Sequence, residues 1–324
     1  MTNILITGIT GLIGKHLMHR LLQEHDYQLV GQYFSPRNTD EYAALGVQMR
    51  QADICQESEL ENLCADCDIV VHSAAKVIDF GSKQEFYLAP YHATRWILDD
   101  ARRHGVKHFV YISSFGPATY IDRSNGIPDE TVPLVKSGVH YDDAKIDAEE
   151  YVKHFCSTHN LRYPIVRPAA VVGPDSVWVR EPIKRAQTTL GLKLIDGGKW
   201  DACLVNAANL ADGIFLTISK PQGQNQTFYF MDEYGVSWRQ YFTELLAMKG
   251  LKPKGKIPRP LALTVARISE KIFPLFGKTP PLSAKSVIAT GSDRRVSAQK
   301  ARTLLGWESH VGYAETMQAI RKSL

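Results

Sequence analysis

The stretch NILITGITGLIG, residues 3–14, decides the fold. It opens with the apolar run Asn3–Thr7, which predicts a short buried strand, and continues with glycines at positions 8, 11 and 14. Glycines at this spacing let backbone N–H groups approach a pyrophosphate, and the N-terminus of the following helix attracts the same anion. Such a motif is weak alone, but the strand before it and the helix after it supply the βαβ context of a dinucleotide site. We therefore expect dinucleotide contacts at Gly8, Thr10, Gly11, Leu12, Ile13 and Gly14.

Strands and helices alternate from this loop to about residue 168. The predicted strands cover residues 28–33, 47–51, 68–72, 107–112 and 162–167, and the predicted helices cover residues 12–25, 83–104 and 141–159. This alternation is typical of α/β proteins with a doubly wound parallel sheet. We expect a Rossmann-type domain in residues 1–168 that carries the catalytic residues. A smaller C-terminal α/β substrate lobe, interleaved with it, is expected in residues 169–324.

Composition and charge restrict the partners. Of the 324 residues, 44% are hydrophobic and 22% are charged, which is ordinary for a globular protein. The net charge of +4 is too small to indicate a nucleic-acid surface. No window approaches 18 uncharged apolar residues, so a membrane-spanning helix is not expected. Residues 261–276 come nearest, and they could lie on a membrane surface or cover an apolar pocket. We expect a small-molecule substrate and no nucleic acid, and a homodimer is allowed.

The five cysteines predict reduced thiols in a cytoplasmic protein. Their number is odd, and a chain of this length can bury a core without disulfides. Cys64 and Cys67 form a CxxC pair, which also raises the alternatives of redox chemistry or zinc. Neither a redox context nor two further ligands at metal spacing follows it. We therefore interpret the pair as small buried residues and expect no metal site.

The end of the second predicted strand bears on the choice of cofactor. An NAD site places an acidic residue there to bind the ribose 2′-hydroxyl. This chain has Gln32, Tyr33 and Phe34 instead, followed by Ser35 and Arg37. A hydroxyl and a guanidinium favour a 2′-phosphate, which a carboxylate would repel. We predict a preference for NADP, with NAD as the alternative and Arg37 then an ordinary solvated residue.

Three residues form a candidate catalytic group. Tyr141 and Lys145 lie four positions apart, so they share one face of the predicted helix. A positive charge beside a tyrosine favours its phenolate form, so we expect Lys145 to lower the pKa of Tyr141. Ser113 and Ser114 follow the strand at residues 107–112, and ligands bind at the carboxyl ends of strands in open α/β sheets. A serine there can orient a carbonyl oxygen.

The chain resembles the extended short-chain dehydrogenases/reductases, the NAD(P)-dependent epimerase/dehydratase superfamily. The resemblance spans essentially the whole length and is carried by residues 7–14, His72–Ala75, Tyr111–Ser114, the YxxxK pair, Arg167-Pro168 and Gly173-Pro174. The closing segment, residues 257–307, is most similar to the 3β-hydroxysteroid dehydrogenase-like branch. The resemblance implies that Ser114 polarises a carbonyl, Tyr141 transfers the proton, and Lys145 binds the nicotinamide ribose and tunes Tyr141. It further implies cofactor contacts at Asp53, Ile54, Ala74, Ala75, Lys76 and Pro168.

Two positions depart from the family pattern. Pro90 stands where the family's long helix usually carries an asparagine that supports a proton-relay water. A proline cannot supply that side chain and should disturb the helix. Phe115-Gly116 stands where sugar-nucleotide dehydratases have an acidic pair, so dehydration is disfavoured.

The leading functional hypothesis is an NAD(P)-dependent oxidoreductase that interconverts a carbonyl and a secondary alcohol. Trp178, Trp200 and the apolar segment at residues 261–276 suggest a small nonpolar or ring-shaped substrate. One alternative is a nucleotide-sugar epimerase with the same triad, whose diphosphate Arg180, Lys184 and Arg185 could contact. A second alternative is a non-catalytic NADP-sensing protein, although such relatives usually lose the tyrosine and lysine.

Overall fold

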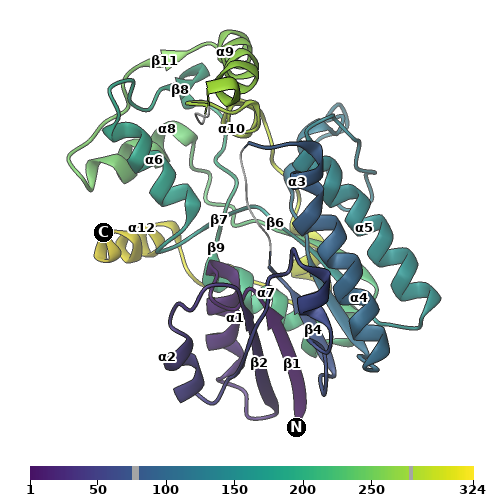
Figure 1. The fold of residues 1–324 in the computed structure, drawn as a ribbon. Helices are drawn as coiled ribbons and strands as arrows, with labels where there is room; N and C mark the ends of the chain where they lie inside the picture. Colours follow the sequence, from purple (N-terminus) through teal and green to yellow (C-terminus); the bar gives the residue numbers. More distant parts are fainter. Residues whose placement is uncertain (75–79, 277–279) are drawn as a thin grey trace.

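A computed structural model describes residues 1–74, 80–276 and 280–324, and Figure 1 shows its fold. Among these residues no helix is long and apolar enough to cross a membrane. The expected cofactor contacts Ala75 and Lys76 lie outside the described residues.

A parallel sheet of seven strands forms the centre of the molecule. Its order is β10 (Gln226–Phe230), β6 (Pro164–Pro168), β5 (His108–Ile112), β4 (Ile69–His72), β1 (Thr2–Thr7), β2 (Tyr27–Tyr33) and β3 (Gln48–Gln51). Each neighbouring pair runs parallel, which confirms the predicted doubly wound sheet. The sequence predicted six of these strands. The seventh, β10, comes from the second half of the chain and pairs with β6.

Helices cover both faces of the sheet (Figure 1). Successive side chains of a strand point to opposite faces, and in β1 Ile4 and Ile6 belong to one core while Leu5 belongs to the other. The first face packs against α1 (Leu12–Leu21), α2 (Thr39–Ala44), α7 (Ala207–Ser219) and α11 (Gln299–Leu305). The second packs against α4 (Ala93–Arg103) and α5 (His140–Thr158). A strand buried on both faces explains the unbroken apolar runs in the sequence.

The helix predicted over residues 83–104 is interrupted. It consists of α3 (Lys83–Tyr87), a π-helical turn (Leu88–His92) and α4, which ends before Gly105. Pro90 lies inside the π-helical turn and is buried. The expected disturbance by this proline is therefore a local widening of the helix, as in π-bulges elsewhere.

The second half of the chain adds smaller elements at the carboxyl edge of the sheet. Two short parallel pairs join β7 (Ala170–Val172) to β9 (Leu204–Asn206) and β8 (Leu194–Ile195) to β11 (Lys256–Ile257). The remaining helices are α6 (Val177–Gln187), α8 (Trp238–Ala247), α9 (Arg259–Ile272), α10 (Ala284–Thr290) and α12 (Tyr313–Ser323). Short 3-10 helices cover Glu57–Leu60, Gly116–Tyr120, Asp196–Gly198, Pro221–Gly223 and Phe273–Phe276. A domain boundary at residue 168 stays a prediction.

Candidate active site

The glycine loop between β1 and α1 is built by close backbone approach. Gly8 has a φ of +67°, and a Cβ atom there would lie 2.9 Å from the Cα of Ala74. Gly14, in the first turn of α1, packs directly against the carbonyl group of Gly8. Side chains at these two positions would push the loop away from β4 and α1, so both glycines are required by the space available.

A buried glutamine braces the same loop. The Gln32 side chain accepts a hydrogen bond from the backbone N–H of Gly8 (2.8 Å) and donates one to the carbonyl of Ala52 (2.6 Å). Gln32 thus ties the glycine loop to the chain just after β3. Gln32 occupies the region where an NAD site usually has the acid that binds the ribose 2′-hydroxyl, and both ends of its side-chain amide are hydrogen-bonded within the protein.

The N-terminus of α1 has the donors that a pyrophosphate needs. Gly11 is its N-cap, and no side chain caps the first turn. Residues 10–12 of this loop, together with Lys15 and His16, line a cavity of about 130 Å³ that Pro174 and Asp175 complete from the second half of the chain. Uncapped N–H groups at a helix start bind anions, so these residues fit a dinucleotide phosphate. Leu12 and Ile13 are half-buried here.

The expected adenosine side is more open. Ser35 and Arg37 are exposed just beyond β2, where the carbonyl of Ser35 accepts a hydrogen bond from the N–H of Arg37 (2.8 Å). Asp53 is half-buried, and its carboxylate accepts a hydrogen bond from the N–H of Cys55 (2.9 Å). Ile54 beside it is buried. These four residues lie at the ends of the adjacent strands β2 and β3.

Tyr141 and Lys145 occupy the first turns of α5, beside the carboxyl end of β5. Lys145 is only 3% exposed, and its Nζ donates hydrogen bonds to the carbonyl of Ile112 (2.8 Å) and the hydroxyl of Tyr111 (3.3 Å). Tyr141 is half-buried one turn earlier. The ammonium is therefore fixed to the end of the strand that Ser114 follows.

The two adjacent serines have different surroundings. Ser113 is buried, and its hydroxyl donates a hydrogen bond to Glu149 (2.5 Å). Ser114 is half-buried, and its oxygen accepts a hydrogen bond from the N–H of Gly116 (3.0 Å). The Ser114 hydroxyl proton has no acceptor assigned among the described residues. Ser114, rather than Ser113, can therefore donate to a substrate.

A buried ion pair lies beneath the site. Arg167 contacts the Glu149 carboxylate through Nη2 (2.6 Å) and Nε, and it donates to the hydroxyl of Tyr229 (3.0 Å). The sequence reasoning missed Glu149, although it lies four residues after Lys145 on the same helical face. Pro168 ends the strand beside this pair, and its carbonyl accepts a hydrogen bond from Phe115 (3.1 Å).

The two titratable residues of the group shift in different ways. Burial raises the pKa of Tyr141, and the Asp142 carboxylate adds to the effect. Without a dinucleotide, desolvation dominates the pKa of Tyr141, and the Lys145 ammonium is bonded to Tyr111 and Ile112. The expectation that Lys145 and a bound nicotinamide lower this pKa stays a prediction. Burial lowers the pKa of Lys145 to about 8, while Glu149 opposes that shift. A tyrosine with a raised pKa keeps its proton at neutral pH and can donate it.

Tyr111 links Lys145 to the π-helical turn. Its hydroxyl accepts from Lys145 and donates to the carbonyl of Pro90 (3.1 Å), which also accepts from the hydroxyl of Thr94 (2.7 Å). Tyr111 and Thr94 are fully buried. The position that lacks the family's asparagine thus still supports Lys145, through its backbone carbonyl and a tyrosine.

The network continues to the glycine loop and determines the form of His72. Because the Thr94 proton is donated to Pro90, the Thr94 oxygen must accept from Nε2 of His72 (3.1 Å). The unprotonated Nδ1 then accepts from the hydroxyl of Thr7 (2.8 Å), whose oxygen accepts the N–H of Ala74 (3.1 Å). Burial lowers the pKa of His72 to about 3, so the ring is neutral. The donors and acceptors match at every step.

The second half of the chain closes over the tyrosine. The Nζ of Lys285, on α10, lies 4.0 Å from the centre of the Tyr141 ring. The guanidinium of Arg294 lies 4.1 Å from the centre of the Phe115 ring and donates to the hydroxyl of Thr119 (2.8 Å). Trp178 and Trp200, which the sequence offered as substrate contacts, are half-buried against the core of the second half. Side chains of the second half thus lie against Tyr141 and Phe115 at the carboxyl edge of the sheet.

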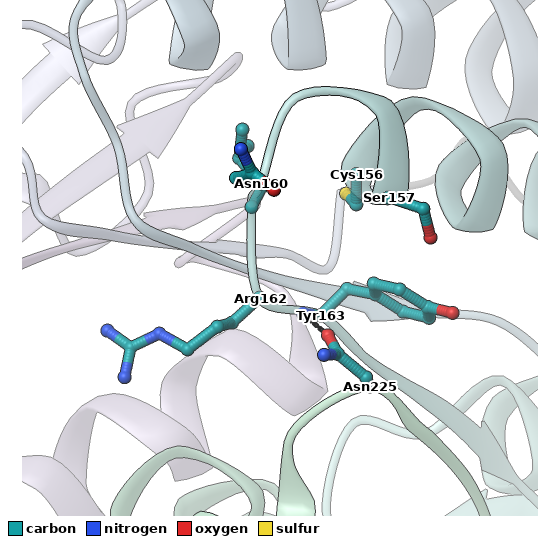
Figure 2. A pocket seen from close by; sticks show the side chains of 7 residues that line it. Cys156, Ser157, Asn160, Arg162, Tyr163 and Asn225 are labelled. Atoms are coloured by element: carbon teal, nitrogen blue, oxygen red, sulfur yellow. Dashed lines mark hydrogen bonds between the residues drawn. The ribbon is translucent and has the colours of Figure 1, made fainter.

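A larger cavity lies at the opposite edge of the sheet. Its volume is about 230 Å³, and it is lined by Cys156, Ser157, Asn160, Leu161, Arg162, Tyr163 and Asn225. Figure 2 shows it where β6 and β10 begin, with Asn225 accepting the N–H of Tyr163. None of the expected site residues lines it. Size alone therefore does not identify the functional site.

Cys64 and Cys67 are both buried and free. Burial raises the pKa of both thiols, which makes them poor nucleophiles. Within residues 1–74, 80–276 and 280–324, no group of three or more potential ligands could hold a metal ion. The cysteine pair therefore fits the interpretation as buried core.

Comparisons with known proteins agree with this geometry. The model of the NAD dependent epimerase/dehydratase family matches residues 4–228. The sterol-4-alpha-carboxylate 3-dehydrogenase (decarboxylating) of Dictyostelium discoideum is 27% identical over 99% of this chain and 100% of its own length. The UDP-glucose 4-epimerase of Vibrio cholerae is 28% identical over 98% of this chain and 95% of its own. The crystal structure of a Thermotoga maritima UDP-glucose 4-epimerase with UDP-glucose superimposes with a TM-score of 0.77 at 21% identity, covering 99% of this chain and 98% of that one.

Proposed function

Because the chain belongs to the NAD-dependent epimerase/dehydratase family and is an enzyme of the extended short-chain dehydrogenase/reductase type, we propose that it interconverts a carbonyl and a secondary alcohol. The observation that carries this proposal is the anchoring of Lys145. Its Nζ is bonded to the carbonyl of Ile112, one helical turn from Tyr141 and beside the loop that holds Ser114. A proton donor, a hydroxyl donor and a fixed cation thus converge at the carboxyl edge of the sheet.

We assign the proton transfer to Tyr141. Its raised pKa keeps the phenol protonated, so in the direction of reduction it donates a proton to the carbonyl oxygen of the substrate. Ser114 donates a hydrogen bond to the same oxygen and orients it. Lys145 binds the nicotinamide ribose and favours the phenolate that Tyr141 becomes. When bound, the dinucleotide supplies or accepts the hydride.

We propose NADP as the preferred dinucleotide. Arg37 and Ser35 are exposed at the end of β2. Positions 32–34 hold glutamine, tyrosine and phenylalanine, so no carboxylate there would repel a 2′-phosphate. NAD is the alternative, which the family description favours.

We propose a small, nonpolar or ring-shaped substrate. The support is the full-length similarity to the Dictyostelium enzyme, whose name specifies a sterol carboxylate. A nucleotide-sugar epimerase is the second candidate, and the similarity to the Vibrio cholerae enzyme favours it. Arg180 and Lys184, which could contact a diphosphate, are exposed on α6. An epimerase would convert UDP-sugars without net consumption of reduced cofactor, whereas a reductase consumes one per turnover.

We also propose a cytoplasmic location, because Cys64, Cys67, Cys156 and Cys203 are buried and form no disulfide among the described residues. A homodimer stays a prediction. A purely sensory role would be excluded by steady-state oxidation of the cofactor.

The decisive experiment is Tyr141→Phe. We expect turnover of a carbonyl panel to fall about a hundredfold or more, because the proton donor is lost. Binding of NADPH, measured by fluorescence, should stay nearly unchanged. Tyr313→Phe is the matched control, since it also removes a hydroxyl from the start of a helix, where Tyr313 donates to Glu244. Unchanged turnover in Tyr141→Phe would refute the assignment.

A further inference from the structure

A buried carboxylate lies directly beside the candidate catalytic residues. Asp142 follows Tyr141 on α5 and is only 7% exposed. Its Oδ1 occupies the space that a Cβ atom on Gly116 would fill, and the Oγ of Ser114 lies 3.2 Å from the position of that Cβ atom. Because Gly116 has no side chain, the Asp142 carboxylate can approach the serine to which we assign the carbonyl oxygen.

The Asp142 carboxylate has no hydrogen-bond donor assigned within the described residues. The buried hydroxyl of Tyr120 lies near enough to favour its charged form, yet this hydroxyl has no partner at hydrogen-bond distance among those residues. Burial raises the pKa of Asp142, and the positive charges of Arg294 and Lys285 oppose that shift. A carboxylate that is removed from water without donors is costly. A ligand that donates a hydrogen bond to Asp142 would remove this cost.

Arg294 is a second buried charge with unused hydrogen-bonding capacity. It is 8% exposed, and its Nε donates to the hydroxyl of Thr119 (2.8 Å), whose own proton is donated to the carbonyl of Gly116 (2.7 Å). The guanidinium also lies 4.1 Å from the centre of the Phe115 ring. These contacts fix its orientation but use only Nε. In the part of the chain that the structure describes, no acceptor is assigned to Nη1 or Nη2.

The two charged groups are near each other but not paired. Each favours the charged form of the other, since Arg294 lowers the pKa of Asp142 and Asp142 raises that of Arg294. No hydrogen bond or ion pair joins these two described residues, so a gap separates them. A group that fills the gap must accept from the guanidinium and donate to the carboxylate. A hydroxyl does both, whereas a carbonyl or an ionised carboxylate only accepts and an ammonium only donates.

We propose that Asp142 and Arg294 form a subsite for a substrate hydroxyl on the carbon next to the reacting carbonyl. The hydroxyl accepts from the Arg294 guanidinium and donates to the Asp142 carboxylate, while Ser114 and Tyr141 contact the carbonyl oxygen. Its place next to the carbonyl follows from the approach of Asp142 to Ser114 at Gly116. This inference rests on the proposed function. It narrows the substrate class to α-hydroxy ketones, or to vicinal diols in the direction of oxidation.

Two ketones of matched size test the subsite: 2-hydroxy-2-methylcyclohexanone and 2,2-dimethylcyclohexanone. They differ only by a hydroxyl in place of a methyl group, and a tertiary hydroxyl cannot itself be oxidised. With NADPH, kcat/KM of the wild type should be at least about tenfold higher for the hydroxy ketone, because the dimethyl ketone leaves both buried charges unpaired. Asp142→Ala and Arg294→Met should each lose most of this preference. Asp142→Asn keeps an acceptor and should retain part of it.

The matched controls are Asp143→Ala and Arg295→Met, which remove neighbouring charges that are already engaged within the protein. Asp143 accepts hydrogen bonds from the N–H groups of Ser137 and Gly138, and Arg295 pairs with Asp293. Both controls should keep the wild-type preference. Ligand-observed NMR with the enzyme saturated with NADP⁺ compares binding of the two ketones without turnover. The melting temperature of each variant checks that a lost preference is not a loss of folding.

Equal binding of the two ketones to the wild type, or no detectable binding of the hydroxy ketone, would overturn the proposal. So would a preference that is lost in Arg294→Met but kept in Asp142→Ala, because the site would then bind only an acceptor. A binding preference that both variants lose supports the subsite even if neither ketone is reduced. In that case the proposed reaction fails and the subsite stands, whereas reduction of both ketones at equal rates and with equal affinity gives the reverse result.

Discussion

Replacement of Tyr111 by phenylalanine probes the support of Lys145 directly. The change removes one hydroxyl, which accepts a hydrogen bond from the Lys145 ammonium and donates one to the carbonyl of Pro90. The carbonyl keeps its bond from Thr94, and the ammonium keeps its bond to Ile112. The ring stays in place, so no cavity is created. Two hydrogen bonds are lost, and only the one from Lys145 involves a charged group.

The magnitude follows from that bond. A hydrogen bond to a charged group contributes about 1.5–3 kcal/mol, and the 3.3 Å length between Nζ and the hydroxyl favours the lower end. This bond stabilises the ammonium form of Lys145 more than the neutral amine, and burial has already lowered the pKa of Lys145 to about 8. About 1.4 kcal/mol corresponds to one pKa unit. Loss of this hydrogen bond should therefore lower the pKa of Lys145 by about one unit. In the wild type the ammonium is lost as pH rises through about 8. In Tyr111→Phe it is lost about one unit earlier.

The assay is the pH dependence of kcat/KM for carbonyl reduction. The decline on the alkaline side should move to lower pH by about one unit in Tyr111→Phe. Tyr241→Phe is the matched control, because it removes a buried hydroxyl that donates to the carbonyl of Trp178, far from Lys145. Both variants should lose about 1 kcal/mol of unfolding free energy in urea. A Tyr111→Phe profile that coincides with that of the wild type, or a uniform loss without a shift, would refute the reasoning.

Two further substitutions test the cofactor site. Gly8→Ala should lower NADPH affinity more than about tenfold and destabilise the fold by about 1–3 kcal/mol, since φ is +67° and the new Cβ meets Ala74 at 2.9 Å. Gly46→Ala is the control, because Gly46 also has a positive φ (+86°) but a Cβ atom there would meet no neighbour within 4 Å. Equal NADPH affinities of the two variants would contradict the importance of the close packing of Gly8 against Ala74. Arg37→Ala should raise KM for NADPH by about tenfold, the loss of roughly 1.4 kcal/mol, and leave KM for NADH unchanged. Equal changes for both cofactors in initial-rate measurements would argue against a 2′-phosphate contact.

The sequence predicted the parts of the fold that local patterns determine. The apolar runs and glycines of the first half located six strands, because a strand buried on both faces has a distinctive composition. The strand β10 was missed, because its five residues lie in the second half of the chain, where the regular alternation of strands and helices gives way to shorter elements broken by glycine and proline. The short parallel pairs of the second half escaped prediction for the same reason.

The candidate site divides in the same way. The positions of Tyr141 and Lys145 follow from helical spacing, whereas the choice of Ser114 over Ser113 follows from the family resemblance. The direction of the pKa shift of Tyr141 could not be predicted from spacing, because burial rather than the neighbouring lysine dominates this pKa. Glu149 was missed because its partner, Arg167, lies on a different element of the fold. Spacing therefore predicts which residues form the candidate site, whereas the environment of each residue depends on tertiary packing.

Pro90 shows how packing can compensate for a missing side chain. Proline lacks an N–H donor but keeps its carbonyl, and this carbonyl accepts hydrogen bonds from two buried hydroxyls. One of these, on Tyr111, has its oxygen free to accept from Lys145 because its proton is already committed to Pro90. The lysine is therefore held through a hydroxyl whose orientation the proline carbonyl determines. In the sequence, Pro90 suggests the loss of a proton-relay residue. In the fold, its carbonyl instead helps to hold the Lys145 ammonium through the hydroxyl of Tyr111.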